Sequence, residues 1–270
     1  MRHRRSALAL VLFLLIVACV TSPLGRKQLI LVSSSQMNQM GVQAFSELKA
    51  KTPIDHDSKK MTYVECIVKP LTEVASRFYS NIPQSWEVVI FQDESSNAFA
   101  LPGGKIGVHT GILKTAQTDA QLAAVLGHEI GHVIAQHGAE RVSQQAGTQL
   151  GLIALGAITP DNPKKNKLMG LLGVGIQLGV ILPFSRTQES EADLIGLDLM
   201  ARAGFDPTQS IELWKNMMAA AGGKSPPEWL STHPAGENRI KNLSQHMDPA
   251  LRFYQEAKNQ GMTHSCIRPD

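Results

Sequence analysis

The sequence predicts a mostly α-helical domain with one small β-sheet, which places the chain in the α+β class. Residues 36–51 and 61–80 repeat apolar side chains at helical spacing, and the chain from Thr118 onward follows the same period with glycine-rich interruptions. Two short β-type stretches, 86–91 and 97–113, lie together between these helical regions. No segment recurs with a period of 20–50 residues, so we do not expect a repeat array.

Turn-forming residues mark the boundaries of these elements. The stretch TPIDHDSKK separates the first two helices, and the Pro-Gly-Gly sequence within 97–113 predicts a turn between two strand pieces. We expect the folded domain to cover residues 36–256, followed by a C-terminal tail at 257–270.

Composition limits the class of function. Of the 270 residues, 43% are hydrophobic, which is enough to bury one substantial core. The formal net charge is only +3 and the basic residues form no stripe, so nucleic-acid binding is not expected.

Residues 1–18 predict a signal peptide. The basic MRHRR precedes the apolar ALALVLFLLIVA, which is too short to cross a bilayer comfortably. The sequence IVAC resembles the box of bacterial lipoproteins, in which the cysteine, here Cys19, carries the lipid; an ordinary secretory signal is the alternative. No aspartate of the kind that retains lipoproteins in the inner membrane follows Cys19, so we expect an outer-membrane anchor that faces the periplasm. Residues 19–35 would then form a tether.

Cys66 and Cys266 remain if Cys19 carries lipid. In an oxidising periplasm they can pair, which would tie the tail to the early helical region. Two free thiols are the alternative, because the sequence does not supply the distance between them.

Residues 168–184, LMGLLGVGIQLGVILPF, form a long apolar and glycine-spaced segment. A buried helix that covers the site is favoured over a membrane-dipping or substrate-binding segment, because the glycines and Pro183 weaken a transmembrane interpretation.

Residues 126–137, LGHEIGHVIAQH, place two histidines and a glutamate at the spacing H-E-x-x-H. On a helix His128 and His132 share a face, so their ring nitrogens can bind one metal ion. Glu129 lies one step around the helix, where it can act on water without being a ligand. His137 lies off this face, and we expect it at a helix end with no role in the site.

A catalytic zinc ion usually has three protein ligands, so a carboxylate from a second helix is expected. Residues 185–205 offer three acids at the beginning of a helix: Glu189 and Asp193 share a face, and Glu191 points about 200° away from Glu189. Either Glu189 or Asp193 ligates and the other supports it. Compensation of the helix dipole is the alternative explanation for these acids.

Four stretches in order, NAFALPGGKIGVHTGIL, HEIGH, ESEADLIGLDLMARAGFDP and LSTHPAGENRI, resemble the M48 peptidases over about residues 60–245. Within that family the chain is most similar to the short lipoprotein or periplasmic metallopeptidases of the cell envelope. The resemblance implies a zincin-like metallopeptidase domain that holds one zinc ion per chain.

The resemblance also implies roles for four further residues. Glu189 becomes the third zinc ligand, and Asp193 becomes the acceptor that orients a ligating histidine. His233 lies near the zinc, where it occupies the water position in a closed state, and Arg239 belongs to the site as well. In the expected mechanism His233 or Arg239 stabilises the oxyanion, and from chemistry alone His233 also suits a donor to the leaving group.

The expected activity is hydrolysis of unfolded or misfolded envelope proteins, with Glu129 as general base and the strand in NAFALPGG binding substrate backbone as an added strand. A zinc amidase that acts on wall peptides is one alternative. The stronger alternative is a chaperone of the envelope assembly machinery, anchored in the outer membrane by lipid, with a closed and latent zinc site.

Overall fold

The computed structural model describes residues 19–80, 82–154, 184–221, 229, 233 and 237–269. The expected signal peptide and all but the last residue of the apolar segment 168–184 lie outside the described residues. In chain order the described elements are β1 (Cys19–Thr21), β2 (Lys27–Leu29), α2 (Ser34–Lys51), α3 (Ser58–Phe78), β3 (Glu87–Phe91), β4 (Ala98–Leu101), β5 (Lys105–His109), α4 (Thr110–Thr115), α5 (Asp119–Ile134), α6 (His137–Ala154), α9 (Arg186–Arg202), α10 (Thr208–Ala221), α12 (Glu237–Gln245) and α13 (Met247–Asn259).

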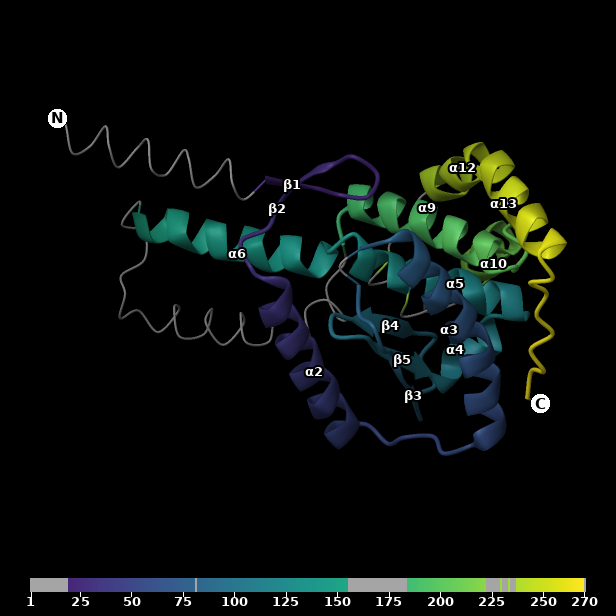
Figure 1. Cartoon of the computed structure of the whole chain (residues 1–270). Coiled ribbons are helices and arrows are strands. Elements are labelled where there is room, and N and C mark those ends of the chain that lie inside the picture. Colours follow the sequence, from purple (N-terminus) through teal and green to yellow (C-terminus); the bar gives the residue numbers. More distant parts are fainter. Residues whose placement is uncertain are drawn as a thin grey trace.

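The helices surround one three-stranded sheet, so the prediction of a mostly helical protein with a small sheet is confirmed. The strand order is β3-β5-β4, with β3 parallel to β5 and β4 antiparallel to it. The Pro-Gly-Gly turn joins β4 to β5, and Gly103 and Gly104 there adopt φ values of 83° and 70° that favour glycine. In Figure 1 the strands lie between α2 and α3, and β4 packs against α5.

Polar caps determine where the first two helices begin. The Ser33 side chain accepts a hydrogen bond from Gln36 N and the Gln36 side chain bonds back, which forms a capping box. Asp57 caps α3 through the backbone N–H groups of Lys59 and Lys60. Both helices therefore begin two or three residues earlier than their apolar periodicity predicted.

Helix α5 lies at the centre of the molecule. It packs against α3, α9, α10 and β4, and Leu122, Leu126 and Ile130 on it are fully buried. A smaller apolar cluster joins Phe45 on α2 to Phe91 and Phe99 on the sheet. The larger cluster holds α5 in place, and the smaller one holds α2 against the sheet.

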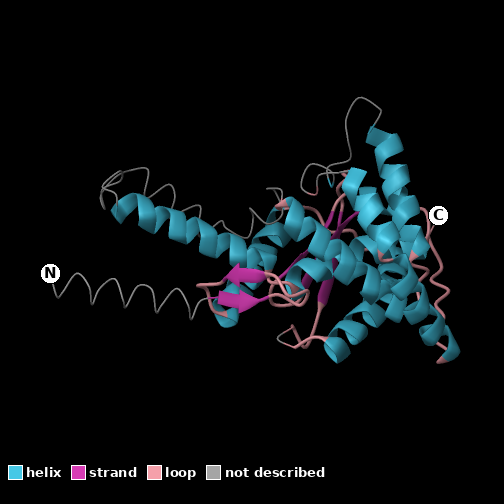
Figure 2. Ribbon diagram, turned by 90° about the horizontal axis from the view of Figure 1, so that it is seen from above, coloured by secondary structure: helices cyan, strands magenta, loops and turns pink. Residues whose placement is uncertain are grey.

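The range 19–35, expected to be a tether, contains an antiparallel hairpin of β1 and β2. Figure 2 shows this pair of strands beside α6. Gln28 Nε2 donates to Ala135 O at 2.7 Å, and Leu31 N donates to Ser143 Oγ at 2.8 Å. The hairpin is therefore bound to the helices, close to the end of α5.

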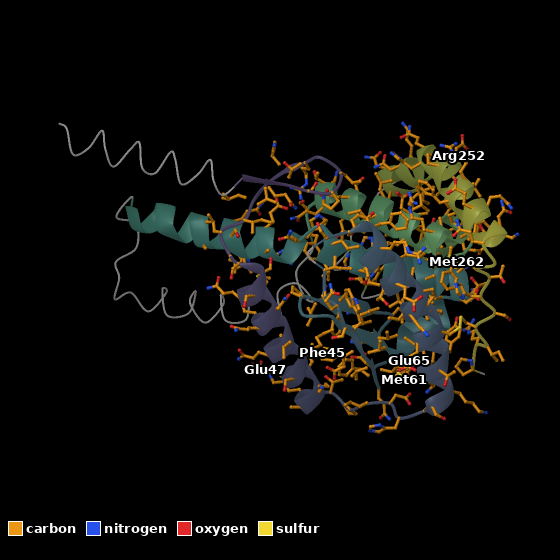
Figure 3. The ribbon with its side chains drawn as sticks, viewed as in Figure 1. Phe45, Glu47, Met61, Glu65, Arg252 and Met262 are labelled. Atoms are coloured by element: carbon orange, nitrogen blue, oxygen red, sulfur yellow. A yellow bond between two sulfur atoms is a disulfide. The ribbon has the colours of Figure 1, made fainter. Side chains whose placement is uncertain are left out.

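A disulfide joins Cys66 on α3 to Cys266 in the C-terminal tail, 200 residues later (yellow bond in Figure 3). The bond holds the tail beyond α13 against the helical core. None of the helices within the described ranges is both long and apolar enough to span a bilayer.

Replacement of both cysteines, Cys66→Ser with Cys266→Ser, should lower the free energy of unfolding by about 2–5 kcal/mol, because the crosslink restricts a long loop of the unfolded chain. Thermal unfolding in the presence and absence of dithiothreitol measures this. The reductant should lower the Tm of the wild type and leave that of the double variant unchanged. Equal Tm values for the two proteins under oxidising conditions would contradict the prediction.

Candidate active site

Helices α5 and α9 touch backbone to backbone, and this contact positions the site. A Cβ atom on Gly196 would lie 2.7 Å from His128 N, and one on Gly131 would lie 2.9 Å from Ala192 O. Only glycine allows the axes to approach so closely. The H-E-x-x-H stretch of α5 therefore faces the first two turns of α9, where the Ser185–Gln188 capping box begins the helix.

Four side chains converge at this crossing. His128 and His132 come from α5, Glu189 from the first turn of α9, and His233 from the segment before α12. Each offers one ligand atom, and these atoms all lie within 4.8 Å of one another. All four residues are buried, with His128 and Glu189 each only 2% exposed.

The spacing of these atoms fits a tetrahedral zinc ion. Ligands at about 2.0–2.2 Å from a tetrahedral zinc are about 3.3–3.6 Å apart. Here His128 Nε2 lies 3.0 Å from His132 Nε2, 3.1 Å from His233 Nδ1 and 3.4 Å from Glu189 Oε2. His132 Nε2 lies 3.6 Å from Glu189 Oε1. Three imidazoles and one carboxylate are also a common donor set for this metal.

Asp193 and Arg239 orient His128. Asp193 Oδ1 lies 3.0 Å from His128 Nδ1 and can only accept, so the ring proton is on Nδ1 and the Nε2 lone pair faces the other donors. Arg239 Nε donates to Asp193 Oδ2 at 2.6 Å, and its Nη1 lies 2.9 Å from Glu189 Oε2. Arg239 thus holds the carboxylates of Glu189 and Asp193 in place.

Glu129 is buried beside the four donors. The Trp229 indole N–H donates to its Oε1 at 2.8 Å, and His233 Nε2 lies 3.4 Å from the same oxygen. Glu129 is not one of the four donor residues, whereas Glu189 lies within 3.6 Å of Nε2 of both His128 and His132. The Glu129 carboxylate is therefore available for proton transfer.

Burial and close charges shift the titration of the cluster. Burial would lower the pKa of His128, but its hydrogen bonds with Asp193 and Glu189 raise it to about 9. Burial and the neighbouring His128 hold the pKa of His132 well below its ordinary value. Burial would raise the pKa of Glu189, but the charge of His233 and hydrogen bonds lower it far below the ordinary range.

A profile described as Peptidase family M48 matches residues 58–247, which is more than half of the chain. The chain belongs to peptidase family M48. Metallopeptidases of this family use zinc, in agreement with the donor set described above.

Three curated relatives illustrate the similarity. The mitochondrial metalloendopeptidase OMA1 of Arabidopsis thaliana is 40% identical over 177 residues, which are 64% of this chain and 34% of that protein. OMA1 of Saccharomyces cerevisiae is 37% identical over 185 residues, 66% of this chain and 51% of that protein. The beta-barrel assembly-enhancing protease of Escherichia coli is 29% identical over 251 residues, 87% of this chain and 50% of that protein. The chain spans about half or less of the length of these M48 relatives.

The structure brings together the residues that the sequence proposed for the M48 site, and it adds others. Trp229 received no role from the sequence, although it lies four residues before His233. His137, expected at a helix end without a role, is the first residue of α6 and its Nδ1 lies 2.9 Å from His132 Nδ1. Phe184, the last residue of the apolar segment, stacks on the His132 ring with 4.0 Å between centroids.

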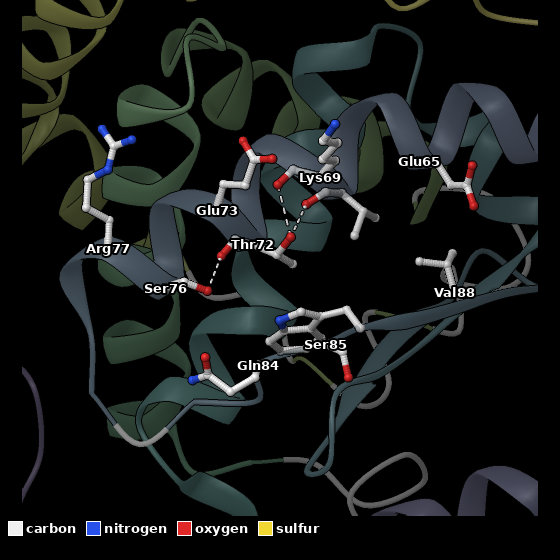
Figure 4. Close-up of a pocket in the computed structure, with 11 residues that line it drawn as sticks. Glu65, Lys69, Thr72, Glu73, Ser76, Arg77, Gln84, Ser85 and Val88 are labelled. Carbon is white, nitrogen blue, oxygen red and sulfur yellow. Dashed lines mark hydrogen bonds between the residues drawn. The ribbon is translucent and has the colours of Figure 1, made fainter.

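A separate hollow of about 740 Å³ lies between α3 and the residues around Trp86 (Figure 4). Polar side chains such as Lys69, Glu73 and Gln84 line it, and the Thr72 hydroxyl donates to Val68 O at 3.0 Å beside it. None of the four metal-donor residues borders this hollow.

Gly196→Ala should separate α5 from α9, because the added methyl group meets the backbone of His128 and Gly127 rather than a movable side chain. We expect a loss of about 1–3 kcal/mol in stability and at least tenfold weaker zinc binding, measured by thermal unfolding and chelator competition. Gly147→Ala in α6 is the control, because a Cβ there meets nothing within 4 Å. Wild-type zinc affinity in Gly196→Ala would contradict the role of the close helix contact.

Proposed function

We propose that the chain is a zinc-dependent endopeptidase that hydrolyses unfolded or misfolded proteins of the cell envelope. The observation that carries this proposal is the cluster of His128, His132 and Glu189 in tetrahedral spacing with Glu129 beside it. A structural zinc site needs four ligands and no adjacent base, so the buried carboxylate of Glu129 supports catalysis.

His128, His132 and Glu189 would hold the metal. When bound, zinc supplies a Lewis acid that makes water nucleophilic near neutral pH and polarises a carbonyl group. Glu129 accepts a proton from the attacking water and delivers it to the leaving amine. The Trp229 indole N–H fixes one carboxylate oxygen of Glu129 and leaves the other for this transfer.

Strand β4 is the element that we propose binds substrate. It is an edge strand of the described sheet, since only β5 pairs with it, and it packs against α5. An extended polypeptide can add to such an edge through main-chain hydrogen bonds. These bonds require no particular side chains, which suits unfolded proteins of varied sequence.

The cell location that we propose rests on the sequence of the N-terminus. A signal peptide over 1–18 and a lipid on Cys19 would anchor the domain of residues 36–256 at the outer membrane, facing the periplasm. The relative named as a beta-barrel assembly-enhancing protease supports a role in the envelope. The OMA1 relatives are named as mitochondrial proteins, so the family serves more than one compartment.

His233 supports a second candidate function. Its Nδ1 lies 3.0 Å from Glu189 Oε1 and 3.1 Å from His128 Nε2, so it fills the fourth corner of the donor set. A metal with four protein ligands has no open position for water. In this second proposal the protein is a lipid-anchored chaperone or assembly factor whose zinc site is closed and latent.

Glu129→Gln should retain the fold and the zinc but lose at least a hundredfold in the rate of casein cleavage, because the amide cannot accept the proton. Metal analysis and cleavage of fluorescent casein measure the two properties. If wild type and variant are equally inert and both restore envelope assembly in cells that lack the gene, the chaperone proposal replaces the peptidase proposal.

His233→Ala should open the fourth corner and raise the rate of casein cleavage, since three protein ligands are enough for a catalytic zinc. The rate is compared with that of the wild type at equal zinc content. A fall in rate at full zinc content would instead assign His233 to the reaction, as a donor to the oxyanion or the leaving group.

A further inference from the structure

A row of buried side chains connects the N-terminal hairpin to His132. The row begins with Arg26, in the turn of the hairpin just before β2, and continues through Glu191 and His137. His137 is fully buried at 0% exposure, and Glu191 is 5% exposed. None of these three residues belongs to the donor set. The last of them, His137, contacts Nδ1 of His132, the ring nitrogen that faces away from the other donors.

The turn after α5 brings His137 to this position. Gln136 has a positive φ of 55°, which a residue other than glycine adopts rarely, and it ends α5 so that α6 begins at His137. Only Ala135 and Gln136 lie between the two helices. His137 therefore lies beside His132 although a continuous helix would place it on another face.

The hydrogen bonds in this row have one consistent direction. Glu191 Oε2 can only accept, so His137 Nε2, at 3.2 Å, carries the proton. His137 Nδ1 is then the acceptor, and His132 Nδ1, at 2.9 Å, donates to it. With its proton on Nδ1, His132 presents the Nε2 lone pair to the other donors, as metal binding requires.

Arg26 fixes the far end of the row. Its Nε donates to Glu191 Oε2 at 2.8 Å, and its Nη1 and Nη2 donate to the two oxygens of Glu140, both at 2.7 Å. Gln188 Nε2 donates to Glu140 Oε2 at 2.7 Å and joins α9 to the same group. One guanidinium thus forms ion pairs with two carboxylates that are each only 5% exposed and would otherwise repel each other.

We propose that Arg26 is a positioning residue for the metal centre, which acts through Glu191 and His137 to fix the tautomer and orientation of His132. The proposal rests on the zinc site of the proposed function. It makes the docked hairpin part of the active centre, because loss of Arg26 frees Glu191 to turn away and removes the acceptor that orients His137. The segment next to Cys19 then influences metal affinity without contacting the metal.

The test measures zinc affinity of the full chain by competition with a chromophoric chelator. Arg26→Met keeps the length of the side chain and removes its hydrogen bonds; it should weaken zinc binding about tenfold, as loss of residues behind a ligand does. Lys27→Met is the matched control, since Lys27 lies in the same hairpin, carries the same charge and, among the described residues, donates its side-chain hydrogen bond to Thr21. The control should bind zinc as the wild type does.

A second readout separates orientation from stability. The absorption bands of the cobalt-substituted protein report ligand geometry, and they should change in Arg26→Met and not in Lys27→Met. The Tm of each metal-free variant shows whether it folds. If the wild type itself binds no zinc, the metal site and the proposed function fail together. If Arg26→Met matches the wild type in affinity and spectrum, only the proposal for Arg26 fails.

A second pair of variants decides the matter if Arg26→Met does not fold. His137→Asn places an acceptor oxygen near the position of Nδ1, and His137→Leu removes the acceptor. We expect His137→Leu to weaken zinc binding by about 10- to 100-fold and His137→Asn to recover most of that loss. Equal affinities of these two variants would overturn the proposal.

Discussion

The backbone contact between α5 and α9 is the constraint on which the rest of the structure depends. Gly127 on α5 and Gly196 on α9 have no room for a side chain between the helices. Because His128 and His132 lie on α5 and Glu189 lies on α9, their donor atoms converge only when the two helix axes are very close. The remaining packing of α3, α10 and β4 around α5 serves to hold this crossing, and Leu126 and Ile130 on α5 are fully buried in it.

The second constraint is electrostatic. Burying carboxylates such as Glu189 and Asp193 costs several kcal/mol each unless hydrogen bonds and opposite charges offset the loss of water. Arg239 provides much of this offset, since its N–H groups are directed at both carboxylates and its guanidinium lies 4.0 Å from the Trp214 ring centre. Those contacts leave Arg239 poorly placed to stabilise an oxyanion, and they suit a residue that holds α9 in register with α5.

Sequence reasoning succeeded where the deciding geometry is local. The first two long helices and the three-stranded sheet follow from apolar period and turns, and the H-E-x-x-H motif lies within five residues of one helix. The hairpin of β1 and β2 and the short helix α4 were not predicted. Helical geometry alone left Glu189 and Asp193 as equal candidates for the third ligand. Which of them faces the two histidines depends on how α9 crosses α5. His137 begins α6, as its prediction as a helix-end residue requires, but its contact with His132 depends on the left-handed conformation of Gln136, which no sequence pattern indicated. Arg26 had no signal at all, since its partners are more than a hundred residues away.

Two of the three imidazoles in the donor set are oriented by parts of the chain that are far apart in sequence. Asp193 and Arg239 act on His128 from the C-terminal helices, and His137 acts on His132 from α6 and the hairpin. No short segment contains this set, so the unfolded chain cannot hold the metal with similar affinity. Metal binding and folding are then linked, because an ion that binds only the folded chain stabilises it by mass action. The linkage also acts in the opposite direction. A change that loosens the contact of the hairpin or of α12 with the rest of the domain lowers the affinity of the site for the metal.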